Sequence, residues 1–362
     1  MFVALRDLRH ARGRFALVGV VVLLISFLVT FLGALTAGLA RESTSAITEL
    51  PVDHLAFAMP APTDAPGFTA SAVEPEQWQR WSTVPGVLSA QPVGILTTRA
   101  TSPATTAAVT ALGVRPASGL LPGGAEVAKG AVVLSTGAAA DLDARTGGRV
   151  TVGGRALVVS DVVDVEASFS HTPVVWVDLA DWQQVAGRAA DGDGATVIAL
   201  STQGLSEADI ARADDAVGTT TVTTSAARSA VSSFTAENMS LTIMLAFLIV
   251  ISALVVGAFF TVWTISRSGD LAVLKALGAS TSYLLRDALA QAAIVLVGGV
   301  ALGTSAAAAA ATALSGFVPV VVDPATVAVP AAGLLTLGLL GAAVSVVRIG
   351  RIDPHAALAA GR

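Results

Sequence analysis

The chain has 362 residues; 54% of them are hydrophobic, 13% are charged, and the formal net charge is −5. A soluble domain carries about 25% charged residues, so this composition excludes a purely soluble protein. The chain contains no cysteine, which excludes a disulfide framework, a cysteine-ligated zinc or iron–sulfur site, and thiol catalysis.

Four stretches contain no Asp, Glu, Lys or Arg, and each is long enough to cross a membrane as a helix. They are residues 15–39, 241–265, 288–314 and 327–347. A helix needs about 20 apolar residues to span the hydrocarbon core. Four buried helices of a soluble protein are disfavoured, because core helices of this length show a polar face. The first stretch is too long for the apolar core of a signal peptide, about 7–15 residues, and is interpreted as a retained span.

Basic residues flank these spans on one side only. Residues 1–14, 266–287 and 348–362 together contain ten Arg or Lys against four acidic residues, whereas 315–326 contains only Asp323. Because basic loops stay in the cytoplasm, both chain ends and the 266–287 segment are predicted to be cytoplasmic. Residues 41–240 then lie outside; their 11 basic and 21 acidic residues exclude a nucleic-acid partner.

The sequence therefore predicts an α-helical membrane protein with four transmembrane helices in a 1+3 layout and a mixed α/β extracellular domain inserted between helices 1 and 2. The expected segments are a cytoplasmic N-terminal helix (1–14), transmembrane helix 1 (15–40), the extracellular domain (41–240), transmembrane helix 2 (241–265), a cytoplasmic coupling loop (266–287), transmembrane helix 3 (288–314), an extracellular loop (315–326), transmembrane helix 4 (327–347) and a cytoplasmic tail (348–362). With 19 Arg, two Lys and abundant alanine, the composition is typical of a GC-rich genome, and we expect the cell membrane of a Gram-positive actinobacterium.

Short Val-rich segments predict strands in the extracellular domain. We expect them at residues 131–134, 149–152, 156–165 and 172–177, with turns at the glycine pairs 147–148 and 153–154. Short helices are predicted at 74–81 and at 179–188, the second beginning after Asp178. Residues 60–67 and 100–110 are rich in Pro, Gly or Thr and are predicted to be loops, and 219–228 leads back to the membrane.

No motif of ATP hydrolysis or of hydrolase chemistry appears in the sequence. It contains no GxxxxGK[ST] P-loop, no HExxH and no GxSxG. Of the four histidines, His54 and His171 are expected outside and His10 and His355 inside, so they do not form one metal site. His171 is interpreted as the end of a loop. The chain is predicted to be a non-catalytic subunit with no metal site and no intrinsic cofactor.

The segment between the second and third spans has an amphipathic pattern. Leu271, Leu274 and Leu277 recur at near-helical spacing, Lys275 supplies a polar position, and Gly278 is a helix-stop signal. Such a helix either lies in the lipid headgroups or docks in a groove of a cytoplasmic ATPase.

Small residues repeat in the last two spans, where they permit close helix contact. They are Gly298, Gly299, Gly303, Gly333, Gly338 and Gly341. Sliding interfaces and tight packing are both compatible with this pattern.

Several segments resemble the FtsX-type ABC permeases, also called MacB/LolC or type VII exporters. The resemblance rests on SRSGDLAVLKALGAS (266–280) followed by LLRDALAQA (284–292), on RIDPHAAL (351–358) after the last span, and on ALRDLRHARGRF (4–15) before the first. In the extracellular domain, GGRVTVGGRALVVSDVV (147–163) and HTPVVWVDLADWQQV (171–185) are similar to the periplasmic core domain of that family. The resemblance covers nearly the whole chain.

This resemblance implies a permease homodimer in membrane lipid, bound to two copies of an ABC ATP-binding subunit. ATP is bound by that partner, whose groove receives the 271–280 segment and the basic tail. Closure of the ATPases moves the spans and the extracellular domains together, which is called mechanotransmission, and the cargo need not pass through a central pore.

Within the family, the opening 40 residues and the modest extracellular domain resemble the DevC/HrtB branch, which includes haem-exporter permeases. A MacB protein carries its own fused ATPase, and no P-loop is present in this sequence. A MacB protein also works with an outer-membrane duct, which a Gram-positive cell lacks. A LolC-type lipoprotein extractor is disfavoured for the same reason. The sequence therefore favours export of haem or a similar amphipathic molecule. The alternative is an FtsX-like signalling permease that relays the state of the ATPase to an extracellular partner.

A cargo site is predicted at the outer end of the second span. Glu237 is the carboxylate nearest the apolar core, where a charge is costly unless it is interfacial or paired. Met239 and Met244 follow, and methionine is a haem ligand in some proteins. Phe27 and Phe31 offer an aromatic face on the first span. Each also has a structural interpretation: a helix N-terminal acid for Glu237 and packing for the others. Haem enters here as transported ligand.

The docking interpretation of the coupling loop is testable with Leu274→Asp. We expect this change to abolish stimulation of the partner ATPase while membrane insertion is retained, because a buried charge prevents the apolar face from entering a groove. Leu274→Met, which retains the apolar face, serves as the control. Full ATPase stimulation by Leu274→Asp would contradict docking through this helix.

Overall fold

The structure is a computed structural model and describes residues 12–61, 64–187, 194–266 and 280–347. The chain divides into two compact units. The helical unit consists of Met1–Leu39 and Met239–Arg362, and the inserted domain is Ala40–Asn238.

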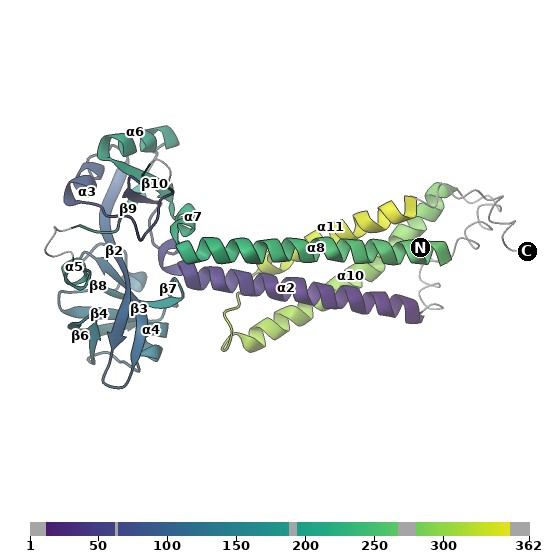
Figure 1. The fold of residues 1–362 in the computed structure, drawn as a ribbon, viewed down its shortest axis with the longest axis horizontal. Coiled ribbons are helices and arrows are strands. Elements are labelled where there is room, and N and C mark those ends of the chain that lie inside the picture. Colours follow the sequence, from purple (N-terminus) through teal and green to yellow (C-terminus); the bar gives the residue numbers. More distant parts are fainter. Residues whose placement is uncertain (1–11, 62–63, 188–193, 267–279, 348–362) are drawn as a thin grey trace, which may run out of the picture. The chain divides into compact units, whose positions relative to one another are not determined.

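Four long helices carry the apolar spans (Figure 1): α2 (Arg12–Thr48), α8 (Ser232–Ser266), α10 (Thr281–Leu314) and α11 (Pro324–Val347). Each contains a segment long and apolar enough to cross a membrane. The predicted fold class is confirmed, since one such helix precedes the inserted domain and three follow it. α2 and α8 extend beyond the predicted spans, to Thr48 and from Ser232, because a helix can continue through polar residues once its backbone is outside the hydrocarbon.

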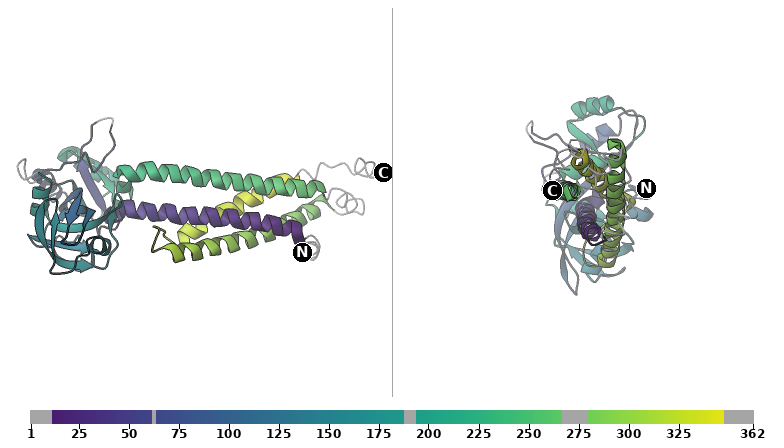
Figure 2. Two further views of the ribbon diagram at one scale, coloured as in Figure 1. Left: turned by 60° about the horizontal axis from the view of Figure 1, so that its bottom comes forward. Right: turned by 90° about the vertical axis from the view of Figure 1, so that its right-hand side faces the viewer.

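Helices of the helical unit run side by side (Figure 2), and glycines allow some of them to lie close together. A Cβ at Gly299 of α10 would lie 2.7 Å from Cγ1 of Val22 on α2, and one at Gly341 of α11 would lie 2.9 Å from the carbonyl oxygen of Ala253 on α8. At Gly298 and Gly333 a Cβ would meet no atom within 4 Å. Close helix packing therefore accounts for some of the small residues in these spans and not for all of them.

Ten strands form the sheet of the inserted domain, in the order β10-β1-β9-β2-β3-β8-β4-β6-β5, with β7 paired to β8. They are β1 (His54–Ala58), β2 (Val87–Thr101), β3 (Thr106–Val114), β4 (Ala131–Ser135), β5 (Arg149–Val152), β6 (Arg155–Val163), β7 (Ser168–Phe169), β8 (Thr172–Asp178), β9 (Val197–Thr202) and β10 (Thr219–Thr223). β1 pairs antiparallel with β10, so the first and last strands of the domain are neighbours.

The long strand β2 takes part in two sheet regions. Its first half, Val87 to Val93, pairs with β9, and its second half, Gly94 to Thr101, pairs with β3. Its last two residues also pair with β5, which closes β2-β3-β8-β4-β6-β5 into a ring. Short helices cover the two regions: α3 (Pro75–Trp81) and α6 (Glu207–Val217) on one, α4 (Thr136–Asp141) and α5 (Leu179–Val185) on the other (Figure 1).

Most local predictions for this domain are confirmed. β4, β5, β6 and β8 occupy the four predicted Val-rich segments, and α3 and α5 occupy the two predicted helices. The Asp178 side chain accepts a hydrogen bond from the backbone N–H of Ala180 at 3.0 Å and so caps α5 at the expected place. The segment 219–228 does more than return to the membrane, since it contains β10 and α7 (Thr224–Ala227).

The prediction of a loop over residues 100–110 is wrong. β2 continues to Thr101 and β3 begins at Thr106, with Ala100 opposite Ala107 and Thr101 opposite Thr106. The true turn is short, and the Ser102 hydroxyl accepts hydrogen bonds from the backbone N–H groups of residues 104 and 105 at 3.1 Å each. The threonines in this segment favour strands because they are β-branched.

Two facing glycines make room for a tryptophan in the core of the domain. Gly94 on β2 is paired with Gly113 on β3, and a Cβ at either position would clash with the side chain of Trp182 on α5. Trp182 is 1% exposed. α5 can therefore lie close to the sheet only because both positions lack a side chain.

Gly113→Ala is expected to lower the free energy of unfolding by about 1–3 kcal/mol, because overpacking forces Trp182 or the strand to move. Thermal unfolding of the purified full chain measures the effect. Gly137→Ala on α4 is the matched control, since its Cβ would meet Pro173 at an ordinary 3.4 Å. A melting temperature of Gly113→Ala equal to that of the wild type would contradict the packing argument.

Candidate functional site

A strained turn connects β7 to β8. Its two residues, Ser170 and His171, have φ angles of +48° and +61°, and Phe169 pairs with Thr172 on either side of them. A two-residue turn with both φ angles positive is normally made by Asn and Gly. For other residues this backbone costs about 1–3 kcal/mol each, and it persists where surrounding contacts enforce it.

The C-terminal turns of α2 supply those contacts. The backbone N–H of Ser170 donates to the Ser43 carbonyl at 3.0 Å, and that of His171 donates to the Glu42 carbonyl at 3.3 Å. The Ser45 hydroxyl accepts from the N–H of Ser168 at 2.9 Å. The turn is therefore fixed to α2 through its own backbone, independently of the imidazole.

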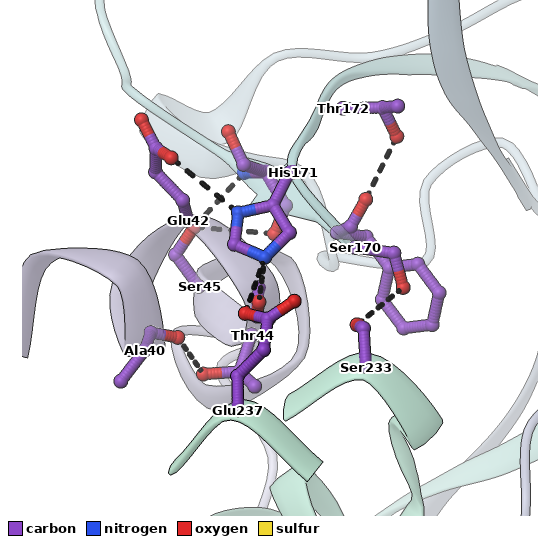
Figure 3. A network of polar contacts seen from close by, with 12 residues as sticks. Ala40, Glu42, Thr44, Ser45, Ser170, His171, Thr172, Ser233 and Glu237 are labelled. Atoms are coloured by element: carbon purple, nitrogen blue, oxygen red, sulfur yellow. Dashed lines mark hydrogen bonds and ion pairs between the residues drawn. The ribbon is translucent and has the colours of Figure 1, made fainter. Parts of the chain in front are cut away.

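The His171 ring lies between side chains of two helices (Figure 3). Its Nε2 is 2.8 Å from the Ser43 hydroxyl and 2.9 Å from a Glu237 carboxylate oxygen of α8, and its Nδ1 is 3.5 Å from a Glu42 carboxylate oxygen of α2. The ring is therefore within hydrogen-bond distance of two carboxylates and one hydroxyl group.

A second contact joins α8 to the same turn: the Ser233 hydroxyl donates to the Ser170 hydroxyl at 3.3 Å. We call this set of residues the His171 junction; its members are Glu42, Ser43, Ser170, His171, Ser233 and Glu237. All of them belong to the inserted domain. The junction therefore holds the end of α2 and the beginning of α8 to one hairpin.

The structure gives Glu237 a partner that the sequence did not reveal. A carboxylate near the apolar core was expected to be interfacial or paired, and it is paired with His171. His171 had been interpreted as the end of a loop; it lies in a tight turn and faces Glu237 and Glu42. No local sequence pattern connects residues 42, 171 and 237, and the hairpin between β7 and β8 was not predicted.

The other predicted cargo residues belong to the helical unit. The rings of Phe27 and Phe31 are stacked, with centroids 5.9 Å apart and planes 8° from parallel. Met239 and Met244 of α8 are 65% and 54% exposed. The structure thus forms the aromatic pair and leaves both methionines on the surface of α8, while Glu237 belongs to the inserted domain. The five-residue cargo site stays a prediction.

The predicted ATPase-coupling residues Leu271, Leu274, Lys275, Leu277 and Gly278 lie outside the described residues. Directly after them, Ser280 caps α10 by accepting a hydrogen bond from the N–H of Tyr283 at 3.3 Å. Within the described ranges, no group of three or more His, Asp or Glu side chains is arranged to hold a metal ion.

Substitution of His171 separates backbone strain from side-chain contacts. We expect His171→Ala to be less stable than His171→Gly by about 1 kcal/mol in the free energy of unfolding, because alanine retains the Cβ that disfavours this φ angle. Both variants lose the imidazole contacts, so their difference reports the strain. Thermal unfolding of the full chain measures it.

Ala117→Gly is the control for this comparison, since Ala117 also has a positive φ, +55°, and lies outside the junction. Glycine there should be stabilising to a similar extent. If His171→Ala is as stable as His171→Gly, the turn is not strained.

Curated relatives come from Staphylococcus. The chain is 27% identical over 194 residues to the Staphylococcus epidermidis protein named "Putative hemin transport system permease protein HrtB", an alignment that covers 54% of this chain and 53% of the relative. It is 33% identical over 132 residues to the protein of the same name from Staphylococcus haemolyticus, covering 35% and 36%. The chain thus spans about half the length of the curated relatives it matches.

Two solved structures resemble part of the chain. One is the extracellular domain of the noncanonic ABC-type transporter YknZ from Gram-positive bacteria, with 16% identity, a TM-score of 0.34, and coverage of 48% of this chain and 98% of that one. The other is the periplasmic region of MacB from Actinobacillus actinomycetemcomitans, with 12% identity, a TM-score of 0.37, and coverage of 49% and 90%.

Family models match most of the chain. Residues 16–228 match the MacB-like periplasmic core domain, and residues 242–354 match the FtsX-like permease C-terminal region. These ranges contain three of the candidate membrane spans, most of the fourth (Ser232–Phe259) and nearly all of the inserted domain, which confirms the resemblance seen in the sequence motifs. The chain belongs to the FtsX/MacB-type family of ABC transporter permeases, which are membrane proteins.

Proposed function

We propose that this permease exports haem or a similar amphipathic molecule by mechanotransmission, in a homodimer bound to two ATPase subunits. The observation that carries the mechanism is the His171 junction, in which one hairpin is bonded to the end of α2 and to the beginning of α8. The cargo rests on the relatives, which carry the name of hemin transport permeases.

The junction is suited to report a displacement of either helix. The hairpin holds α2 through two backbone hydrogen bonds, whereas its hydrogen bonds to α8 involve the side chains of Ser233 and Glu237. Hydrogen bonds weaken steeply when distance or angle changes, so a shift of α8 breaks the His171–Glu237 contact before the hairpin leaves α2. In our proposal, closure of the ATPases drives this shift.

The predicted cargo residues have the chemistry that haem requires. Haem is a flat apolar ring with an iron atom and two carboxylates at its edge. Met239 and Met244 supply thioether ligands, and Phe27 and Phe31 supply a stacked aromatic pair. Both ring nitrogens of His171 have partners in this structure, so in our proposal His171 positions Glu237, and Glu237 contacts the cargo.

The proposal keeps both chain ends in the cytoplasm of a Gram-positive actinobacterial cell and the inserted domain outside. The excess of basic residues in 1–14, 266–287 and 348–362 supports this orientation. It places residues 271–280 where a cytoplasmic ATPase can bind them.

A haem absorption titration of the purified chain tests the cargo and its site. Saturable binding is expected, and Glu237→Gln is expected to weaken it about tenfold or more, because contacts to a charged group contribute about 1.5–3 kcal/mol. Met244→Leu should alter the Soret band if its sulfur binds the iron. The shift of the Soret band with haem concentration gives the affinity.

Glu207→Gln on α6 and Met59→Leu after β1 are matched controls, since both residues are exposed and lie outside the predicted site. They should bind haem as the wild type does. Binding that never exceeds the partition into empty detergent micelles would overturn haem as cargo, and unchanged binding by Glu237→Gln would remove this residue from the site.

The second candidate, a signalling permease, requires an exposed apolar patch on the inserted domain. Among the described residues of that domain, the exposed large apolar side chains are Met59, Leu88 and Val158. They belong to the end of β1, to β2 and to β6, which are not neighbours in the sheet. This distribution favours the exporter over the signalling permease.

A further inference from the structure

A cavity of about 280 Å³ lies in the inserted domain, between the end of α2, the loop 119–124 and strand β8. Its floor is apolar: Trp176 is 3% exposed, and Leu120 and Leu121 are nearly buried. Gly123 and Gly124 of this loop also line the cavity, and both have positive φ angles, which glycine adopts without strain.

The mouth of the cavity is negatively polarised. Glu49 is the only charged residue among those that line it, and it directly follows the last residue of α2. The last carbonyl groups of a helix lack intrahelical partners and carry partial negative charge. The N–H of Glu49 donates to the Ser45 carbonyl at 3.0 Å, that of Leu50 donates to the Ile47 carbonyl at 3.3 Å, and Pro51 has no N–H to donate. Apolar walls and a negative mouth together select an apolar group that carries a positive charge.

The Glu49 carboxylate already pairs with a cationic side chain of the protein, that of Arg41. The Arg41 guanidinium on α2 lies 2.9 Å from a Glu49 oxygen, and both side chains are about half exposed. Ion pairs of this kind are weak in water. A ligand whose apolar part enters the cavity can therefore replace Arg41 at Glu49, because burial of that part adds to the attraction between the charges.

We propose that this cavity binds a compact amphipathic cation, a single ring or short alkyl chain that ends in an ammonium group. Pockets for drug-sized ligands have volumes of about 300–1,000 Å³, so this cavity takes a smaller molecule. It is separate from the predicted cargo site and does not depend on haem as cargo. Because its walls come from α2 and from the ring of strands, the bound ligand links the end of α2 to β8.

Three probes with one apolar body and different charges test the proposal on the full chain in lipid nanodiscs. They are 3-phenylpropylamine, 3-phenylpropanol and 3-phenylpropanoate, titrated by calorimetry with empty nanodiscs subtracted. Affinity is expected to fall from the amine to the alcohol to the carboxylate. Glu49→Gln should weaken binding of the amine about two- to fivefold and leave the alcohol unchanged. Arg41→Gln should strengthen amine binding by a similar factor, since it frees Glu49.

Two further variants separate the possible results. Glu166→Gln removes an exposed carboxylate near β8 that does not line the cavity, and it should bind all probes as the wild type does. Ala46→Leu fills the cavity from α2 and should abolish binding of all three probes. Equal affinity for the three probes, an unchanged amine affinity in Glu49→Gln, or amine binding no stronger than to empty nanodiscs would overturn the proposal, whatever the cargo is.

Discussion

The lack of water in a bilayer is the constraint on which this structure depends. Backbone N–H and C=O groups in hydrocarbon must pair within their own segment, so the four charge-free stretches form helices. Inside the membrane these helices approach one another closely at small residues, as at Gly299 and Gly341. Most acidic residues, 21 of 26, lie in residues 41–240, where the His171 junction uses two of them.

The sequence predicted the spans and many strands because those features are local. An uncharged run of more than 20 residues and a Val-rich segment between glycines each have one dominant interpretation. The hairpin at residues 100–110 was missed because threonine and alanine suit both loops and strands, and the choice depends on pairing with distant β5 and β8. The closure of the strand ring through Ala100 and Val152 depends on long-range register, which no local pattern encodes.

The candidate site was predictable in part. Glu237 could be singled out because a carboxylate beside an apolar run is costly without a partner. That partner, His171, is far away in sequence and sits in a turn that usually contains Asn-Gly. A histidine in such a turn is explained better by the two carboxylates that flank its ring than by turn chemistry. Glu42 and Ser43 were not assigned to the site for another reason. The first transmembrane helix was expected to end with its apolar stretch, whereas α2 continues through polar turns that contain both residues.

The pairing of β1 with β10 also constrains how the chain is made. His54 lies opposite Thr223, so the sheet region that begins the domain is incomplete until almost all of the domain has been synthesised. Contacts between residues so far apart are slow to form, because a long loop must close first. α2 can enter the membrane early, since the backbone hydrogen bonds of a helix are local. Meanwhile β1 must wait for β9 and β10, which leaves its edges unpaired during biogenesis. Folding of the inserted domain is therefore completed only after nearly all of it has been synthesised.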